Sequence, residues 1–122
     1  MMNVKNYRNE GNCLTFESTT FDPAIWVAQD RTRASKFEKL IVRMKTSVTE
    51  NDMLQFFWKT ELVSEYSENH CVKASVRPSP DFVEYVLPLK NATGWQGHVT
   101  ELRLDPVMTP GIQVEIESIR LE

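Results

Sequence analysis

The stretch Glu84-Tyr85-Val86-Leu87-Pro88-Leu89 decides the fold class of this 122-residue chain. Tyr85, Leu87 and Leu89 alternate with the other three residues, which gives a period of two. Successive side chains of a β-strand point to opposite faces, so this alternation predicts a strand with one buried face. The turn signal Pro78-Ser79-Pro80-Asp81 separates it from the preceding residues.

The same period recurs on both sides of this stretch. Residues 71–77 alternate between apolar and mostly polar positions, and Leu102 and Leu104 flank Arg103. Residues 114–121 also alternate, but their phase changes part-way, which predicts a bulge near Ser118. The second half of the chain therefore predicts four strands and an all-β character.

The first half is ambiguous between helix and strand. The apolar residues within 34–44 fit a helical stripe, and they also fit a strand with one face made of Leu40, Val42 and Met44. Residues 53–63 show the same ambiguity, and a strand there would place three residues on one face: Leu54, Phe56 and Trp58. Periodicity favours a helix slightly for the first segment and does not decide between the two structures.

Composition limits the classes of protein to consider. With 14 Lys+Arg, 17 Asp+Glu and 41% hydrophobic residues, the chain predicts one globular domain over residues 1–122. The formal net charge of -3 argues against a nucleic-acid partner, which a basic face would normally bind. No segment approaches the roughly eighteen apolar residues of a membrane span, so we expect no membrane insertion. The four glycines form no phosphate-binding loop.

Seven segments stand in a familiar order along residues 12–122: Phe21-Asp22-Pro23-Ala24-Ile25, Phe37 to Lys45, Leu54 to Thr60, Tyr85 to Leu89, Trp95-Gln96-Gly97, Leu102 to Pro106 and Val114 to Leu121. Together they resemble the galactose-binding-domain-like β-sandwiches, which include many carbohydrate-binding modules. The resemblance implies that both ambiguous segments are strands in an antiparallel jelly-roll β-sandwich of two packed sheets. It also implies a non-catalytic, lectin-like accessory module that binds an oligo- or polysaccharide, within or beside a larger glycan-active protein. A protein-interaction or scaffolding sandwich without sugar binding is the alternative.

Aromatic residues are the first candidates for such a site, because sugars present apolar C–H faces that stack on flat rings. Trp58 shares the phase of Leu54 and Phe56, so we expect it in the core. Trp26 falls on the opposite parity from its apolar neighbours and is expected to face outward, toward a ligand, a covering loop or a partner. Trp95 lies in a loop that resembles a W-x-G of the family; it is expected to pack over the end of the sandwich and is kept as a ligand candidate.

A polar set around Phe57 completes the predicted site. If strands 37–46 and 53–60 were neighbours, their outward residues would surround an exposed Phe57: Arg43, Lys45, Gln55 and Lys59. Such a face holds glycans in several of the resembling modules, and a solvated basic face is the alternative. Tyr66, in the following loop, is a further candidate. The ligand-binding residues predicted from the sequence are Trp26, Arg43, Gln55, Phe57, Lys59, Tyr66 and Trp95.

No catalytic motif accompanies these residues. His70 and His98 have no metal-ligand spacing, and no G-x-S-x-G nucleophile motif occurs. Carboxylate pairs such as Glu101 with Asp105 would suit glycoside hydrolysis, but solvated surface charge is the commoner role of such pairs. We therefore expect no enzyme activity and no catalytic residue.

The resemblance also raises a structural calcium, which many of these modules hold between their first and last strands. The matching positions are Glu17 and Glu117, where the family usually has Asp at the second position. The longer side chain weakens the match, so no cofactor or metal is predicted. Cys13 and Cys71 lie beside apolar residues and are expected to be two buried thiols, although the sequence leaves a disulfide open.

Overall fold

The computed structural model describes residues 4–10, 13–19, 25–62 and 64–122, with side chains described for 13–19, 33–62 and 64–122. Its strands are β1 (Val4–Glu10), β2 (Cys13–Ser18), β3 (Ile25–Arg33), β4 (Lys39–Thr46), β5 (Asp52–Thr60), β6 (Cys71–Val76), β7 (Val83–Pro88), β8 (His98–Asp105) and β9 (Gln113–Leu121). Two short 3-10 turns join them, η1 (Ala34–Lys36) and η2 (Glu68–His70).

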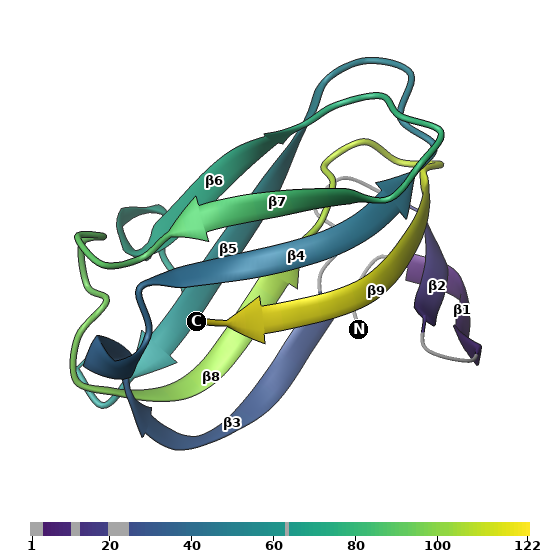
Figure 1. Ribbon diagram of the computed structural model, residues 1–122. Coiled ribbons are helices and arrows are strands. Elements are labelled where there is room, and N and C mark those ends of the chain that lie inside the picture. The colour runs from purple at the N-terminus through teal and green to yellow at the C-terminus, as the bar shows by residue number, and fades with distance from the viewer. Residues whose placement is uncertain (1–3, 11–12, 20–24, 63) are drawn as a thin grey trace.

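The strands form two antiparallel sheets that pack face to face (Figure 1). One sheet has five strands in the order β1-β2-β9-β4-β7, and the other has four in the order β3-β8-β5-β6. Within the described residues the structure contains no α-helix. The prediction of an all-β sandwich of two packed sheets is confirmed.

The core lies between the sheets and settles the ambiguity of the first half. Leu40, Val42 and Met44 of β4 point inward, and each is at most 1% exposed. The residues of β5 that face them from the other sheet are equally buried: Leu54, Phe56 and Trp58. Both segments are strands, and the helical interpretation is wrong, because pairing with neighbouring strands outweighs a local periodicity that both structures satisfy.

The predicted bulge in the last strand is present. Arg43 of β4 pairs with Ser118 of β9, whereas the next residue, Met44, pairs with Ile116. Glu117 is therefore the extra residue on β9, which accounts for the change of phase seen in the sequence.

Two tryptophans close one end of the core. The rings of Trp58 and Trp95 meet edge to face, with centroids 5.1 Å apart. Each indole N–H donates to a backbone oxygen, Trp58 to Gly94 (2.9 Å) and Trp95 to Phe37 (3.1 Å). The core position predicted for Trp58 is confirmed. Trp95 is only 6% exposed, so its expected packing over the end of the sandwich is confirmed, and its ring has little surface left for a ligand.

Candidate functional site

A pocket of about 200 Å³ lies on the outer face of the four-stranded sheet, and it brings predicted site residues together. Its lining residues come from β5, β8 and the segment between β5 and β6: Gln55, Phe57, Tyr66, Ser67, Glu68, Arg103 and Asp105. Phe57 pairs in register with Arg103, and Gln55 pairs with Asp105. Directly opposite residues of antiparallel strands share a face, so this register places the four side chains side by side.

Aromatic rings form the floor and one wall of this pocket. The rings of Phe57 and Tyr66 meet edge to face, with centroids 6.4 Å apart. The Arg103 guanidinium carbon lies 5.3 Å from the Phe57 centroid and 5.7 Å from that of Tyr66. Because Arg103 and Tyr66 cover it, Phe57 is only 7% exposed. The prediction of an exposed Phe57 is wrong; the half-buried Tyr66 is the ring that borders the pocket from the loop.

A bidentate ion pair holds the guanidinium over these rings. Arg103 donates from Nε to Asp105 Oδ1 (2.9 Å) and from Nη2 to Asp105 Oδ2 (3.0 Å). Asp105 is 1% exposed, and the Arg103 side chain is 19% exposed. Two parallel charge-assisted bonds fix the plane of a guanidinium as well as its position, so Arg103 is preorganised in the pocket.

Tyr66 is anchored from a second direction. Its hydroxyl donates to Glu101 Oε1 (2.6 Å), while the Lys59 Nζ lies 4.5 Å from its ring centroid and 3.7 Å from Glu101 Oε2. Burial, and then the neighbouring Glu101 carboxylate, raise the pKa of Tyr66 above its ordinary value of 10.0. The tyrosine therefore stays a neutral donor, and Lys59 contacts its ring without lining the pocket.

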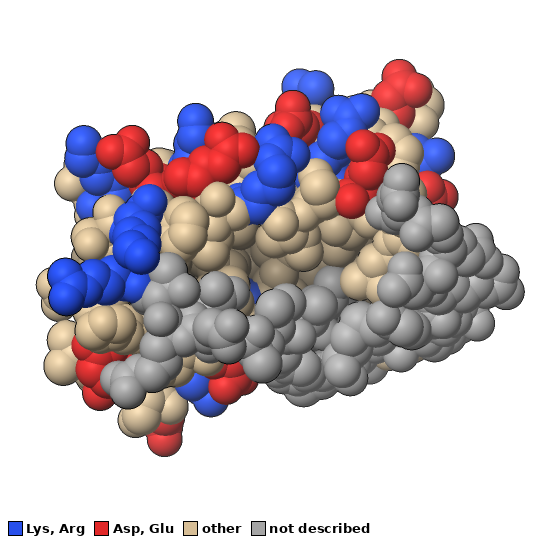
Figure 2. All heavy atoms as spheres, turned by 60° about the horizontal axis from the view of Figure 1, so that its bottom comes forward, with Lys and Arg blue, Asp and Glu red and all other residues tan. Residues whose placement is uncertain are grey.

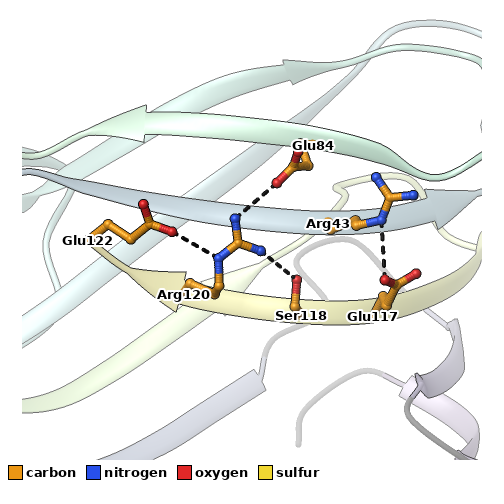
Figure 3. Close-up of polar contacts among 6 residues, drawn as sticks. All are labelled: Arg43, Glu84, Glu117, Ser118, Arg120 and Glu122. Carbon is orange, nitrogen blue, oxygen red and sulfur yellow. Dashed lines mark hydrogen bonds and ion pairs between the residues drawn. The ribbon is translucent and has the colours of Figure 1, made fainter.

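Arg43 lies elsewhere, because strands β4 and β5 are in different sheets. It sits on the outer face of the five-stranded sheet, where its Nε lies 3.3 Å from Glu117 Oε1 (Figure 3). Nearby, Arg120 contacts Glu84 and Glu122, and Figure 2 shows positive and negative side chains interspersed along one side of the molecule. The predicted adjacency of strands 37–46 and 53–60 is wrong, and Arg43 and Lys45 do not share a surface with Phe57.

Trp26 lies on β3, where only the backbone is described. That backbone pairs with β8, with Trp26 in register with Arg103. The side chain of Trp26 lies outside the described residues, so its contact with a ligand stays a prediction.

Sequence reasoning did not assign Arg103 and Asp105 to the site. The signal for them was the outward Arg103 between two buried leucines, a pattern that any solvated strand also shows. What marks these residues in the structure is the burial of Asp105 and the ring beneath the guanidinium, and both depend on strand pairing.

The two residues matched to a calcium site contact different side chains. Glu17 of β2 is in register with Gln113 of β9, whose side chain donates to it. Glu117 lies four residues further along β9, roughly 13 Å at the usual strand rise, and pairs with Arg43. In the structure each carboxylate therefore has its own protein partner.

Three further observations concern metal ligands, membrane-spanning helices and the cysteines. Within the described part of the chain, no three His, Cys, Asp or Glu side chains are placed to hold a metal ion. The same residues contain no helix long and apolar enough to cross a membrane. Cys13 and Cys71 are free thiols. Full burial was expected for both, but each is only half-buried.

Comparison with known proteins finds solved structures that share this fold. No family model matches the chain, and no curated protein matches it. Among solved structures, a mutant of a family 29 carbohydrate-binding module aligns with a TM-score of 0.64 and 12% identity over 96% of this chain and 74% of that chain. A family 11 module of a cellulosomal cellulase of Clostridium thermocellum aligns with a TM-score of 0.61 and 13% identity, covering 89% and 73%. The chain has the fold of these β-sandwich modules.

That fold also carries catalysis in another protein. A family 12 xyloglucanase from Bacillus licheniformis aligns with a TM-score of 0.53 and 11% identity over 98% of this chain and 84% of that chain. At such identities the likeness concerns the fold alone, so function has to be argued from the site.

Proposed function

We propose that this chain is a non-catalytic glycan-binding module whose ligand occupies the pocket on the outer face of the four-stranded sheet. The observation that carries the proposal is the half-buried ring of Tyr66 beside the bidentate Arg103–Asp105 pair. A sugar unit has apolar C–H faces and a rim of hydroxyl groups, so it is bound by flat rings together with fixed donors and acceptors. This pocket offers both.

The polar groups of the pocket suit an uncharged sugar. The Ser67 hydroxyl both donates and accepts, and the partly exposed Arg103 donates, which matches the dual character of a hydroxyl group. The cations described on this face each have a carboxylate within reach: Lys59 with Glu101, Arg103 with Asp105, and Lys73 with Glu68. Paired charges leave little net attraction for an anionic polysaccharide, so the proposed ligand is neutral.

The carboxylates support binding over catalysis. Asp105 is held by two bonds from Arg103, and Glu101 accepts from Tyr66 and faces Lys59. The two carboxylates lie four positions apart on β8, and each is engaged by another side chain. Each carboxylate orients a neighbouring side chain, which is the role of a binding site.

The test is affinity electrophoresis of the purified chain through gels that contain soluble cellulose derivatives or xyloglucan, the glycans named for structural neighbours. We expect retention by at least one gel without release of reducing sugar. Tyr66→Ala should lose that retention, because the ring is the wall of the pocket. Phe82→Ala is the matched control, since Phe82 is a half-buried ring beneath two cations on the other sheet. Equal loss in both variants would overturn the assignment of the ligand to this pocket, and no retention on any gel would favour the protein-interaction alternative.

A further inference from the structure

A second and larger pocket lies beside the first. It has a volume of about 560 Å³ and opens where η2 and β6 approach the loop that follows β7. Val72 and Ala92 supply apolar surface, while Asn69, Asn91 and Thr93 supply groups that donate and accept hydrogen bonds. Ligand pockets occupy about 300–1,000 Å³. The second pocket falls within that range, and the first, at about 200 Å³, falls below it.

The turn η2 forms the boundary between the two pockets. Ser67 lines the first pocket, Asn69 lines the second, and Glu68 lines both. The turn is held in place because the Asn69 backbone N–H donates to Ser67 Oγ (3.1 Å) and the Cys71 thiol donates to the Glu68 carbonyl (3.3 Å). The two pockets therefore border the same turn and share Glu68.

The pairing of β5 with β6 also places residues of the two pockets side by side. Phe57 of β5, in the first pocket, pairs directly with Cys71 of β6, which lines the second. Opposite residues share a face, so a molecule in the first pocket has Cys71 as its next neighbour toward the edge of the sheet.

The charges of the second pocket are also paired. Glu68 Oε2 lies 3.0 Å from the Lys73 Nζ, and the Lys90 Nζ lies 3.7 Å from Glu38 Oε1. The groups left to recognise a ligand are amides and a hydroxyl, which suit the hydroxyl groups of a neutral sugar as well as the first pocket does.

We infer that the glycan site continues from the first pocket across Glu68 into the second. The site then binds a chain of several neutral sugar units, and not a single unit in the first pocket. The units beyond Tyr66 lie over Cys71 and are bound by the side-chain amides of Asn69 and Asn91. This inference rests on the proposed function and adds a second subsite to it.

Calorimetry with cellotriose and cellohexaose on the full chain tests the chain-length dependence. We expect the hexaose to bind about tenfold more tightly than the triose, a difference of about 1.4 kcal/mol. The double variant Asn69→Ala/Asn91→Ala should remove that difference while leaving the triose affinity unchanged, since both asparagines are exposed and outside the first pocket. A hexaose that binds no more tightly than the triose, or a double variant that keeps the difference, would overturn the second subsite. Absence of binding by both sugars would instead overturn the proposed function and the subsite with it.

Thiol protection reports the position of the chain directly. Cys71 lines the second pocket, while Cys13, on β2 of the other sheet, is an internal control with similar burial. Burial, and then Glu68, raise the pKa of the Cys71 thiol, so alkylation by iodoacetamide is followed at mildly alkaline pH. Saturating cellohexaose should slow alkylation of Cys71 at least fivefold and leave Cys13 unchanged. Binding of the hexaose without protection of Cys71 would show that the chain leaves the first pocket in another direction.

Discussion

The outer faces of the two sheets carry the same kinds of interaction in different surroundings. Each has a pocket of about 200 Å³ and a cation over an aromatic ring. On the five-stranded sheet, the pairs Arg43–Glu117 and Lys45–Glu115 have side chains 37–42% exposed. On the four-stranded sheet, Asp105 is almost completely buried and two aromatic rings line the pocket.

The comparison shows which features distinguish a site from a charged surface. Volume and ion pairs do not, because both faces have them. The pocket on the five-stranded sheet is bordered by Lys45, Glu115 and Pro80, and the described residues that line it include no aromatic side chain. A solvated ion pair contributes little and holds its groups loosely, whereas a buried carboxylate holds its partner in one geometry. Preorganisation beside a ring is therefore the feature on which the proposed site depends.

The largest expected difference between the faces comes from removing one carboxylate on each. Asp105→Ala should lower the free energy of unfolding by about 3 kcal/mol, the lower end for breaking a buried pair, because the guanidinium is left partly buried without its partner. Glu117→Ala removes an exposed partner of Arg43 and should cost less than about 1 kcal/mol. Urea unfolding of both variants measures the difference. Similar losses in the two would mean that the burial of Asp105 confers no special strength on its pair.

Substitution of the two lysines that lie over aromatic rings distinguishes an effect on glycan binding from an effect on stability. Lys59 Nζ lies 4.5 Å from the Tyr66 centroid, and Lys45 Nζ lies 5.3 Å from that of Phe82. Each is also 3.7 Å from a carboxylate oxygen. Either lysine changed to Ala should cost less than about 1 kcal/mol of stability. Of the two variants, only Lys59→Ala should weaken retention by the glycan gel severalfold, because it frees the Tyr66 ring to move. Retention lost equally in Lys45→Ala would place the ligand on the other sheet.

A smaller effect follows from the raised pKa of Tyr66. Folding favours the protonated hydroxyl, so its contribution to stability is complete below the ordinary pKa of 10.0 and is lost as the pH rises above that value. Stability should therefore fall between pH 9 and pH 11 more steeply in the native sequence than in Tyr66→Phe, which has no hydroxyl to ionise. Thermal melts across this range measure the slope. Parallel slopes would show that Glu101 does not hold the hydroxyl in solution.

Salt should produce the smallest effect. Ions screen charges over about 10 Å at 0.1 M, which weakens the exposed pairs of the five-stranded sheet first. Binding of a neutral sugar among paired charges should change by less than about twofold between 0.05 and 0.5 M NaCl, since no net charge is neutralised. A steep loss of affinity with salt would indicate an anionic ligand and contradict the neutral glycan.

Local sequence patterns predicted the strands of the second half and their inward faces. Alternation placed Tyr85, Leu87 and Leu89 in the core, and the change of phase near Ser118 located the bulge of β9. These features follow from the two-residue period of a strand, which is a property of adjacent residues alone. For β4 and β5 the pattern gave the correct inner faces once they were taken as strands, a choice that came from the family resemblance.

Which strands are neighbours was decided only by the tertiary structure. The sequence placed Arg43 beside Phe57, but β4 and β5 belong to opposite sheets, and residues distant in the chain came together instead: Tyr66 with Glu101 and Phe57 with Arg103. For Trp95 the sequence predicted packing over the end of the sandwich, but only the tertiary structure showed that Trp58 is its partner. A strand's own residues fix which side chains share a face, but the partner across that face is set by long-range pairing and core packing, which no local period encodes.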